Sequence, residues 1–119
     1  MAIIRIYTGP DGQSHFEDIE PQFAPRSDQS EHAVVHESSG IIIRRFDPQR
    51  SNPWHNAPGQ VCVLTLSGAV DIEVGDGTVR RLTPGDILIA EDTAGQGHIT
   101  REVGEGPRVS IFVPLRDQA

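Results

Sequence analysis

The chain has 119 residues, of which 36% are hydrophobic and 23% are charged, and its formal net charge is −7. This length suits one domain with a sizeable core. The acidic balance argues against a nucleic-acid partner, because nucleic-acid phosphates require a basic surface. No segment approaches the roughly 20 apolar residues of a membrane span, so we expect no membrane partner.

The first element is a short apolar segment, Ile3–Tyr7, which predicts a β-strand. The turn-forming run Thr8–Gly12 interrupts this segment too early for a signal peptide, and we therefore expect a cytoplasmic protein. The single cysteine, Cys62, cannot form an internal disulfide, which agrees with a reducing compartment.

Residues 8–30 are rich in polar and turn-forming residues, with Phe16, Ile19 and Phe23 as isolated apolar anchors. This composition predicts an N-terminal arm that packs against the rest of the fold, either in the same subunit or in a partner.

Short stretches of strand character recur through the remainder of the chain, whereas helical periodicity is weak. The strand candidates are Ala33–His36, Ile41–Phe46, Val61–Leu66, Ala69–Val74, Val79–Leu82, Ile87–Ala90, His98–Glu102 and Val109–Val113. Turn residues separate most of these stretches. Many short strands with this punctuation predict an all-β sandwich or barrel.

The clearest strand is Ala69–Val74, where apolar and polar residues alternate with the period of two of a half-buried strand. The run Gly75–Gly77 then predicts a tight hairpin turn. After the next strand, Pro84-Gly85-Asp86 turns the chain into the apolar run Ile87–Ala90.

These features resemble the cupin superfamily. The Pro84-Gly85-Asp86 turn after a hairpin, the histidine-bearing strand beyond it, and Gly68 at the close of an apolar strand are typical of that family. The resemblance covers about residues 40–114. It implies an all-β fold, a cupin-type double-stranded β-helix (jelly-roll) barrel over residues 40–116, with residues 1–39 as an N-terminal strand and arm.

The resemblance also implies a homodimer, because cupins commonly pair through a sheet and outward-facing Cys62 and Leu64 are apolar residues available to bury.

The first metal-binding motif of cupins contains two histidines and a glutamate, followed by a glycine that corresponds here to Gly68. Counting back from Gly68 places His55 at the first histidine position, Ala57 at the second and Val61 at the glutamate position. Gln60 lies next to that position, and the period of a strand turns it to the opposite face unless a β-bulge intervenes.

The second cupin motif places its histidine at Gln96, whereas His98 lies two residues later. Because side chains on a strand alternate with a period of two, two extra residues in the Thr93–Gly97 loop would leave His98 on the same face as the histidine of the motif. We therefore expect His98 to point into the barrel. The resemblance thus implies His55 and His98 as imidazole ligands of a divalent transition metal.

A carboxylate from Glu91 or Asp92 would complete such a metal site. With Ala57 and Val61 at two ligand positions, we favour no tightly bound metal, the alternative being a weakly held one.

A barrel of this kind is expected to act on a small organic molecule. His55 and His98 can serve as general acid and base, with Asp92 as an auxiliary group. This chemistry would be that of an isomerase, lyase, dehydratase or cyclase; metal-dependent oxygenase chemistry is the enzymatic alternative. A non-catalytic ligand-binding or sensory cupin, or a filled structural barrel, are further alternatives.

Three residues are candidates for binding the small molecule. Trp54 would either line the cavity or plug one end of the barrel, and Gln60 would add a polar group. One of Arg44 and Arg45 should face inward, where it would favour an anionic substrate; we assign Arg44 to this role.

Overall fold

The computed structural model describes residues 1–33 and 37–115, which form strands and turns. The strands in chain order are β1 (Ile3–Thr8), β2 (Ser14–Asp18), β3 (Ala24–Pro25), β4 (Glu31–His32), β5 (Ile42–Phe46), β6 (Ser51–His55), β7 (Val61–Ser67), β8 (Ala69–Glu73), β9 (Val79–Leu82), β10 (Ile87–Glu91), β11 (His98–Val103) and β12 (Arg108–Pro114). The described part of the chain contains no helix that could span a membrane.

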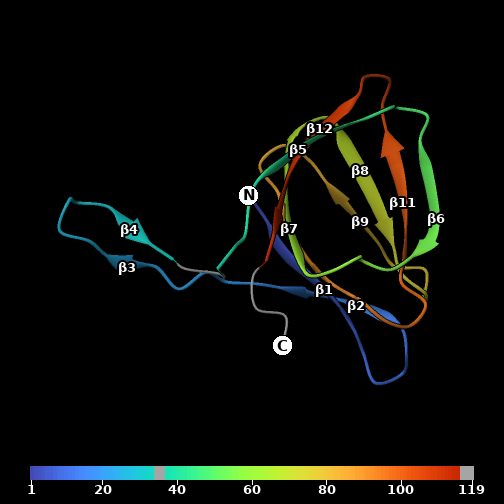
Figure 1. Cartoon of the computed structure of the whole chain (residues 1–119), viewed down its shortest axis with the longest axis horizontal. Coiled ribbons are helices and arrows are strands. Elements are labelled where there is room, and N and C mark those ends of the chain that lie inside the picture. The colour runs from blue at the N-terminus through green and yellow to red at the C-terminus, as the bar shows by residue number, and fades with distance from the viewer. Residues whose placement is uncertain (34–36, 116–119) are drawn as a thin grey trace.

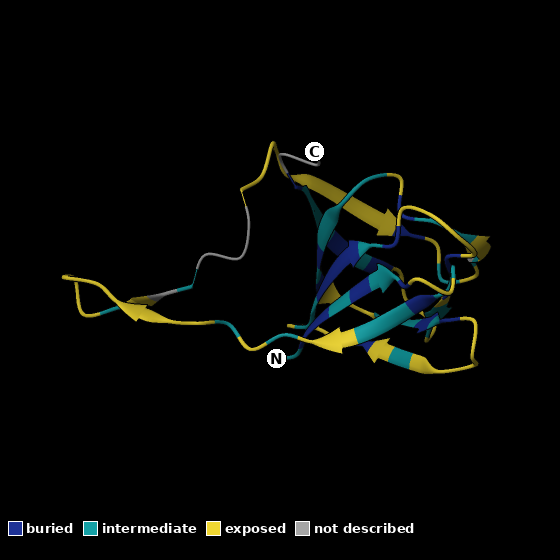
Figure 2. Cartoon of the chain, turned by 90° about the horizontal axis from the view of Figure 1, so that it is seen from below, coloured by how far each residue is buried: buried dark blue, intermediate teal, exposed yellow. Residues whose placement is uncertain are grey.

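Two sheets form a barrel (Figure 1). A six-stranded sheet has the order β2-β1-β10-β7-β12-β5, and a four-stranded sheet has the order β6-β11-β8-β9. The short strands β3 and β4 form a separate hairpin that projects away from the barrel, and its residues are mostly exposed (Figure 2). The all-β barrel expected from the sequence is confirmed.

The barrel core lies between the two sheets, where the buried residues gather (Figure 2). Strand β8 shows why: Val70 and Ile72 are 1% and 4% exposed, whereas Asp71 on the opposite face forms an ion pair with Arg81. The strands expected after residue 40 match β5 and β7–β12 to within about one residue at most ends. The alternation of side chains therefore predicted these seven strands, whereas β6, whose segment Ser51–His55 shows no such alternation and contains Pro53, was not predicted.

The N-terminal segment contributes more strand than its sequence predicted. Strand β1 pairs in parallel with β10, with Ile4 opposite Leu88, and β2 pairs antiparallel with β1. Strand β2 was expected to be part of a polar arm, because one apolar residue, Phe16, is too little to show a period of two. Residues 34–36 of the predicted strand Ala33–His36 lie outside the described residues.

The outer face of the six-stranded sheet carries a second, smaller apolar cluster. Ile3, Ile89 and Leu115 are buried there, and Cys62 and Ile19 pack against them. Ile19 lies directly after β2, so the N-terminal segment covers the cysteine, in agreement with the outward orientation expected for Cys62. Burial raises the pKa of the Cys62 thiol, which makes this thiol a weak nucleophile.

Candidate active site

A cavity of about 250 Å³ lies inside the barrel and is lined by both sheets. Its apolar lining is formed by Phe46, Ala57, Pro58, Val61, Val63, Val70, Ile72, Leu82, Leu88, Ala90 and Phe112. Its polar lining is formed by Arg44, Arg50, Asn52, His55, Asn56, His98, Thr100 and Arg108. A largely apolar wall with a few converging polar groups is typical of a small-molecule site.

His98 is a buried titratable group of the cavity. It opens strand β11, is 6% exposed, and its Nδ1 donates a hydrogen bond to Asp92 Oδ2 at 2.5 Å. Asp92 follows β10, is 0% exposed, and also accepts a hydrogen bond from Ser14 Oγ on β2 at 2.7 Å. The carboxylate therefore fixes the orientation of the imidazole and leaves Nε2 as its available nitrogen.

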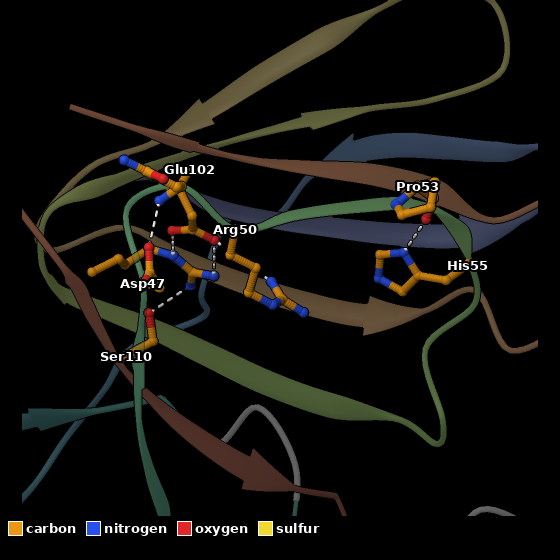
Figure 3. Close-up of polar contacts among 8 residues, drawn as sticks. Asp47, Arg50, Pro53, His55, Glu102 and Ser110 are labelled. Carbon is orange, nitrogen blue, oxygen red and sulfur yellow. Dashed lines mark hydrogen bonds and ion pairs between the residues drawn. The ribbon is translucent and has the colours of Figure 1, made fainter. Parts of the chain in front are cut away.

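His55 lies beside His98, at the end of β6, and the two ring centroids are 4.4 Å apart. His55 Nδ1 donates a hydrogen bond to the carbonyl oxygen of Pro53 at 2.8 Å, as Figure 3 shows. Burial lowers the pKa of His55, and the positive charges of His98 and Arg50 lower it further, against the raising effect of the Pro53 carbonyl. His55 is therefore neutral near pH 7, with Nε2 carrying the lone pair.

Gly97 sets the approach of the two histidine segments. Its φ is +78°, and a Cβ atom built on it would lie 2.0 Å from the carbonyl oxygen of His55. A side chain there would collide with the backbone of His55, so glycine is required for the close contact. His98, which follows this loop, lines the cavity, in agreement with the inward orientation expected from the sequence.

Three arginines surround the ring of Phe46 in the same cavity. The guanidinium carbons of Arg44, Arg50 and Arg108 lie 4.7, 4.6 and 4.0 Å from the ring centroid. Such cation–π contacts hold the planar guanidinium groups against an apolar wall. Figure 3 shows Arg50 between the cluster around Glu102 and the ring of His55.

Glu102 neutralises part of this charge. It accepts two hydrogen bonds from Arg108, at 2.7 and 3.0 Å, and lies 3.6 Å from Arg50 Nη1. Arg108 also donates to Ser110 Oγ at 2.8 Å, so it is held on two sides (Figure 3). Arg44 makes no ion pair with a carboxylate among the residues that the structure describes.

The sequence residues proposed for the site separate into two groups. His55, His98 and Arg44 line the cavity, and Asp92 supports His98 from behind. Trp54 is 40% exposed on β6 and Gln60 is half-buried before β7, and neither is among the residues that line this cavity.

The two carboxylates considered beside the histidines have separate places. Glu91 lies 3.4 Å from Arg5 and does not line the cavity. Asp92 is the carboxylate that contacts His98.

Sequence reasoning missed Arg50, Arg108 and Glu102. The alternation of side chains along a strand would have found two of them. Glu102 lies four residues after His98 on β11, which faces inward. Arg108 lies four residues before Phe112 on β12, which lines the cavity. Arg50 lies just before β6 in a turn, where no period applies.

The side chains that line the cavity lack part of the ligand set that the resemblance to cupins implies. Ala57 and Val61, at two of the family's ligand positions, do line the cavity, but they carry no donor atom. Within residues 1–33 and 37–115, no group of three or more histidine, cysteine, aspartate or glutamate side chains could hold a metal ion. Two imidazoles alone do not fit a centre with three protein ligands.

Comparisons of sequence gave no match to a known protein-family profile or to a curated protein. By structure, the chain is similar to protein NMB1881 from Neisseria meningitidis, with a TM-score of 0.51, 12% identity, and 81% of this chain and 82% of that chain covered.

It is also similar to the conserved protein SPY1581 of unknown function from Streptococcus pyogenes (TM-score 0.48, 21% identity, 71% and 72% covered). A third similar structure is a candidate ethanolamine utilization protein Q from Salmonella typhimurium (TM-score 0.48, 13% identity, 98% of both chains covered). The chain thus has an all-β jelly-roll fold, and the 12% identity to the Neisseria protein shows a likeness of fold alone.

Proposed function

We propose that the chain is a cytoplasmic enzyme that moves protons on a small organic molecule bound in the barrel cavity. The observation that carries the proposal is the pairing of His98 with Asp92, since a buried carboxylate that orients an imidazole is a recurrent arrangement of general bases. The half-buried free thiol of Cys62 agrees with a reducing compartment.

In the proposed reaction, His98 Nε2 takes a proton from a carbon next to a carbonyl group. The electron pair of the broken C–H bond moves onto the carbonyl oxygen to form an enolate. Return of the proton to the other face of the same carbon epimerises the molecule, and where a double bond is conjugated with the enolate, protonation of its far carbon isomerises the molecule instead. If the β-carbon carries a leaving group, that group departs with the electron pair of its bond, the carbonyl re-forms, and the product is an unsaturated carbonyl compound. His55, which is neutral near pH 7 and lies beside His98, is the second acid/base residue.

Proton transfer can be measured without knowing the substrate, as exchange of C–H for deuterium from D2O by NMR. The probes are small ketones, keto acids and hydroxy acids. General acid–base catalysis contributes about 10²- to 10⁴-fold, so His98→Gln should slow exchange by an amount in that range. His15→Gln is the matched control, because His15 pairs with Asp11 on a hairpin away from the cavity lining.

Exchange that His98→Gln leaves at the wild-type rate would overturn the catalytic role of His98. No exchange with any probe, together with a ligand recovered unchanged from the protein, would favour a second candidate, a non-catalytic binding protein. Ala57 and Val61 support that second candidate, because they make the wall beside His55 apolar where the family places ligands.

We also propose that two copies of the chain form a homodimer through the edge strand β5. This strand is the last of the six-stranded sheet, and Ile41, Ile42 and Ile43 at its start are 73%, 49% and 72% exposed. An open edge with apolar side chains favours pairing with a second strand.

Sedimentation over a dilution series tests the dimer. Ile43→Lys should shift the mass toward the monomer, whereas Val79→Lys, on the edge strand of the other sheet and 46% exposed, should not. A wild-type protein that stays monomeric throughout would overturn the dimer.

A further inference from the structure

We propose that the arginine end of the cavity is a carboxylate-binding subsite, so that the molecule held in the barrel is an organic acid with an apolar body. The inference rests on the proposed function for the position of the ligand between the arginines and the histidines. It adds the chemical class of that ligand and the residue that selects it.

The arginine end of the cavity carries more positive than negative charge. Arg44, Arg50 and Arg108 meet around one phenyl ring, whereas Glu102 is the one carboxylate that pairs with any of them among the described residues. Two positive charges are therefore in excess. Gathering like charges against an apolar wall is unfavourable unless an anion joins them, because burial weakens the screening by water.

The three arginines differ in their existing partners. Arg108 uses Nε, Nη1 and Nη2 on Glu102 and Ser110 and is the structural member of the cluster. Arg50 shares Glu102 at the longer distance of 3.6 Å. Arg44, whose side chain is exposed yet borders the cavity, keeps its guanidinium edge for an incoming ligand.

The electrostatics of Arg44 agree with this assignment. Burial lowers the pKa of Arg44, and the charges of Arg50 and Arg108 lower it further. All three causes disfavour the cation, and an anion at the guanidinium edge would offset them. Arg44 is also stacked on Phe112, at 4.7 Å, so its plane is already oriented for a planar partner.

The geometry favours a carboxylate over a phosphate. A guanidinium edge can form two parallel hydrogen bonds with either anion, so the choice rests on the other donors of the cavity. Phosphate sites usually add backbone N–H donors from a helix N-terminus or a glycine-rich loop. The described residues form no helix, and Arg44 and Arg108 lie on strands paired with each other.

The rest of the wall specifies the body of the acid. The lining also includes the aliphatic side chains of Val63, Val70, Ile72 and Leu88. An alkyl or aryl group would fill this part of the cavity. The carboxylate at Arg44 would then direct the body of the ligand toward His98, because the two residues border the same cavity.

Binding can be measured directly with simple probes by saturation-transfer NMR and titration calorimetry. The acids are hexanoate, benzoate and phenylacetate; their neutral counterparts are hexanamide, benzamide and phenylacetamide; inorganic phosphate tests the other anion class. We expect at least one acid to bind and its amide to bind at least tenfold more weakly. Arg44→Gln should weaken the binding of that acid about tenfold to hundredfold, as for loss of charged hydrogen bonds.

Arg45→Gln is the matched control, because it removes the same charge from the next residue of β5, which does not line the cavity. Equal losses in the two variants, amide binding as tight as acid binding, a preference for phosphate, or no binding by any acid would each overturn the inference.

The outcome is separable from that of the proposed catalysis. Arg44-dependent acid binding that persists in His98→Gln, with no proton exchange by the wild type, would leave the subsite standing and remove the enzyme. Conversely, proton exchange that depends on His98 but is unchanged by Arg44→Gln would support the enzyme and remove the carboxylate subsite.

Discussion

His55 and His98 face the same cavity with ring centroids 4.4 Å apart, yet each ring is anchored by a different kind of acceptor. A backbone carbonyl holds Nδ1 of His55, whereas a buried carboxylate holds Nδ1 of His98. Two imidazoles that are neighbours in space therefore differ in their electrostatic surroundings.

The first prediction concerns the titration of His55. Because burial and two nearby positive charges lower the pKa of His55, we expect its ring signals to titrate below 6.5, the ordinary value of histidine. NMR of ring-labelled protein measures this, and the His55→Gln variant assigns the signal. A midpoint above 6.5 would contradict the electrostatics described for the site.

The same shift makes stability depend on pH, with a definite sign. The unfolded chain takes up a proton at His55 near pH 6.5, and the folded chain does so only at lower pH. The contribution of neutral His55 to the free energy of unfolding is therefore fully present above pH 6.5. It is lost as the pH falls from 6.5 through the lower pKa of the folded state. The His55→Gln variant should lose less stability than the wild type over that interval in denaturant unfolding.

The second prediction concerns Asp92, which is fully buried and accepts hydrogen bonds from His98 and Ser14. Asp92→Ala leaves two buried donors without an acceptor, and we expect it to lower the free energy of unfolding by about 1–3 kcal/mol or more. The control is Asp18→Ala, which breaks an exposed ion pair with Arg80 and should cost less than about 1 kcal/mol. Equal costs would show that the buried bonds add nothing.

Asp92→Asn separates the stabilising role from the proposed catalytic one. It conserves the shape of the side chain, so the fold should be retained. The amide cannot stabilise a protonated His98 as a carboxylate does, and proton exchange should therefore slow. Full activity in this variant would show that Asp92 only supports the fold.

The third prediction concerns Gly97. We expect Gly97→Ala to destabilise the protein by more than about 1 kcal/mol and to shift the NMR signals of His55, because a Cβ would lie 2.0 Å from the His55 carbonyl oxygen. The control is Gly77→Ala, which also has a positive φ, +89°, but no atom within 4 Å of its Cβ. The difference between the two unfolding free energies isolates the collision with His55, and no difference would exclude it.

The fourth prediction concerns metal removal. The cavity lining contains two metal-binding side chains, His55 and His98, within the described ranges. We expect treatment with a chelator to leave the thermal unfolding temperature and the His98-dependent proton exchange unchanged. The opposite outcome is that the chelator lowers the unfolding temperature or the exchange rate and that one divalent ion restores it. If that effect is absent in His55→Ala, the cavity holds a metal centre with fewer protein ligands than usual.

Seven of the eight barrel strands after residue 40 were predictable from the sequence because their side chains alternate between a core face and an outer face; β6 (Ser51–His55) was the exception. Strand β8 shows this alternation most clearly. Strand β2 was not predictable, because its partner β1 supplies the apolar residues and its own Ser14 is buried through a hydrogen bond to Asp92. Such a bond joins residues far apart in the chain, and a local sequence pattern does not predict it.

The candidate site was predictable where parity applied. His98 was placed inside the barrel by counting residues in steps of two, and Arg44 was assigned to the inner face of its strand. Arg50 could not be found in this way, because it lies in the turn between β5 and β6. Asp92 was proposed as an auxiliary carboxylate, but its choice over Glu91 depends on which of the two turns away from Arg5.

The pairing of β1 with β10 has a consequence for how the chain is completed during synthesis. The backbone N–H of Ala2 is bound by the carboxylate of Asp86, 84 residues later. Strand β1 leaves the ribosome before β10 and must therefore remain unpaired on that side until β10 has emerged. Ser14 likewise meets Asp92 only then. Neither the pairing of β1 with β10 nor the contact of Asp92 with His98 can form before these later segments have left the ribosome, and a chain stalled earlier would expose the apolar face of β1 to chaperones or to other chains.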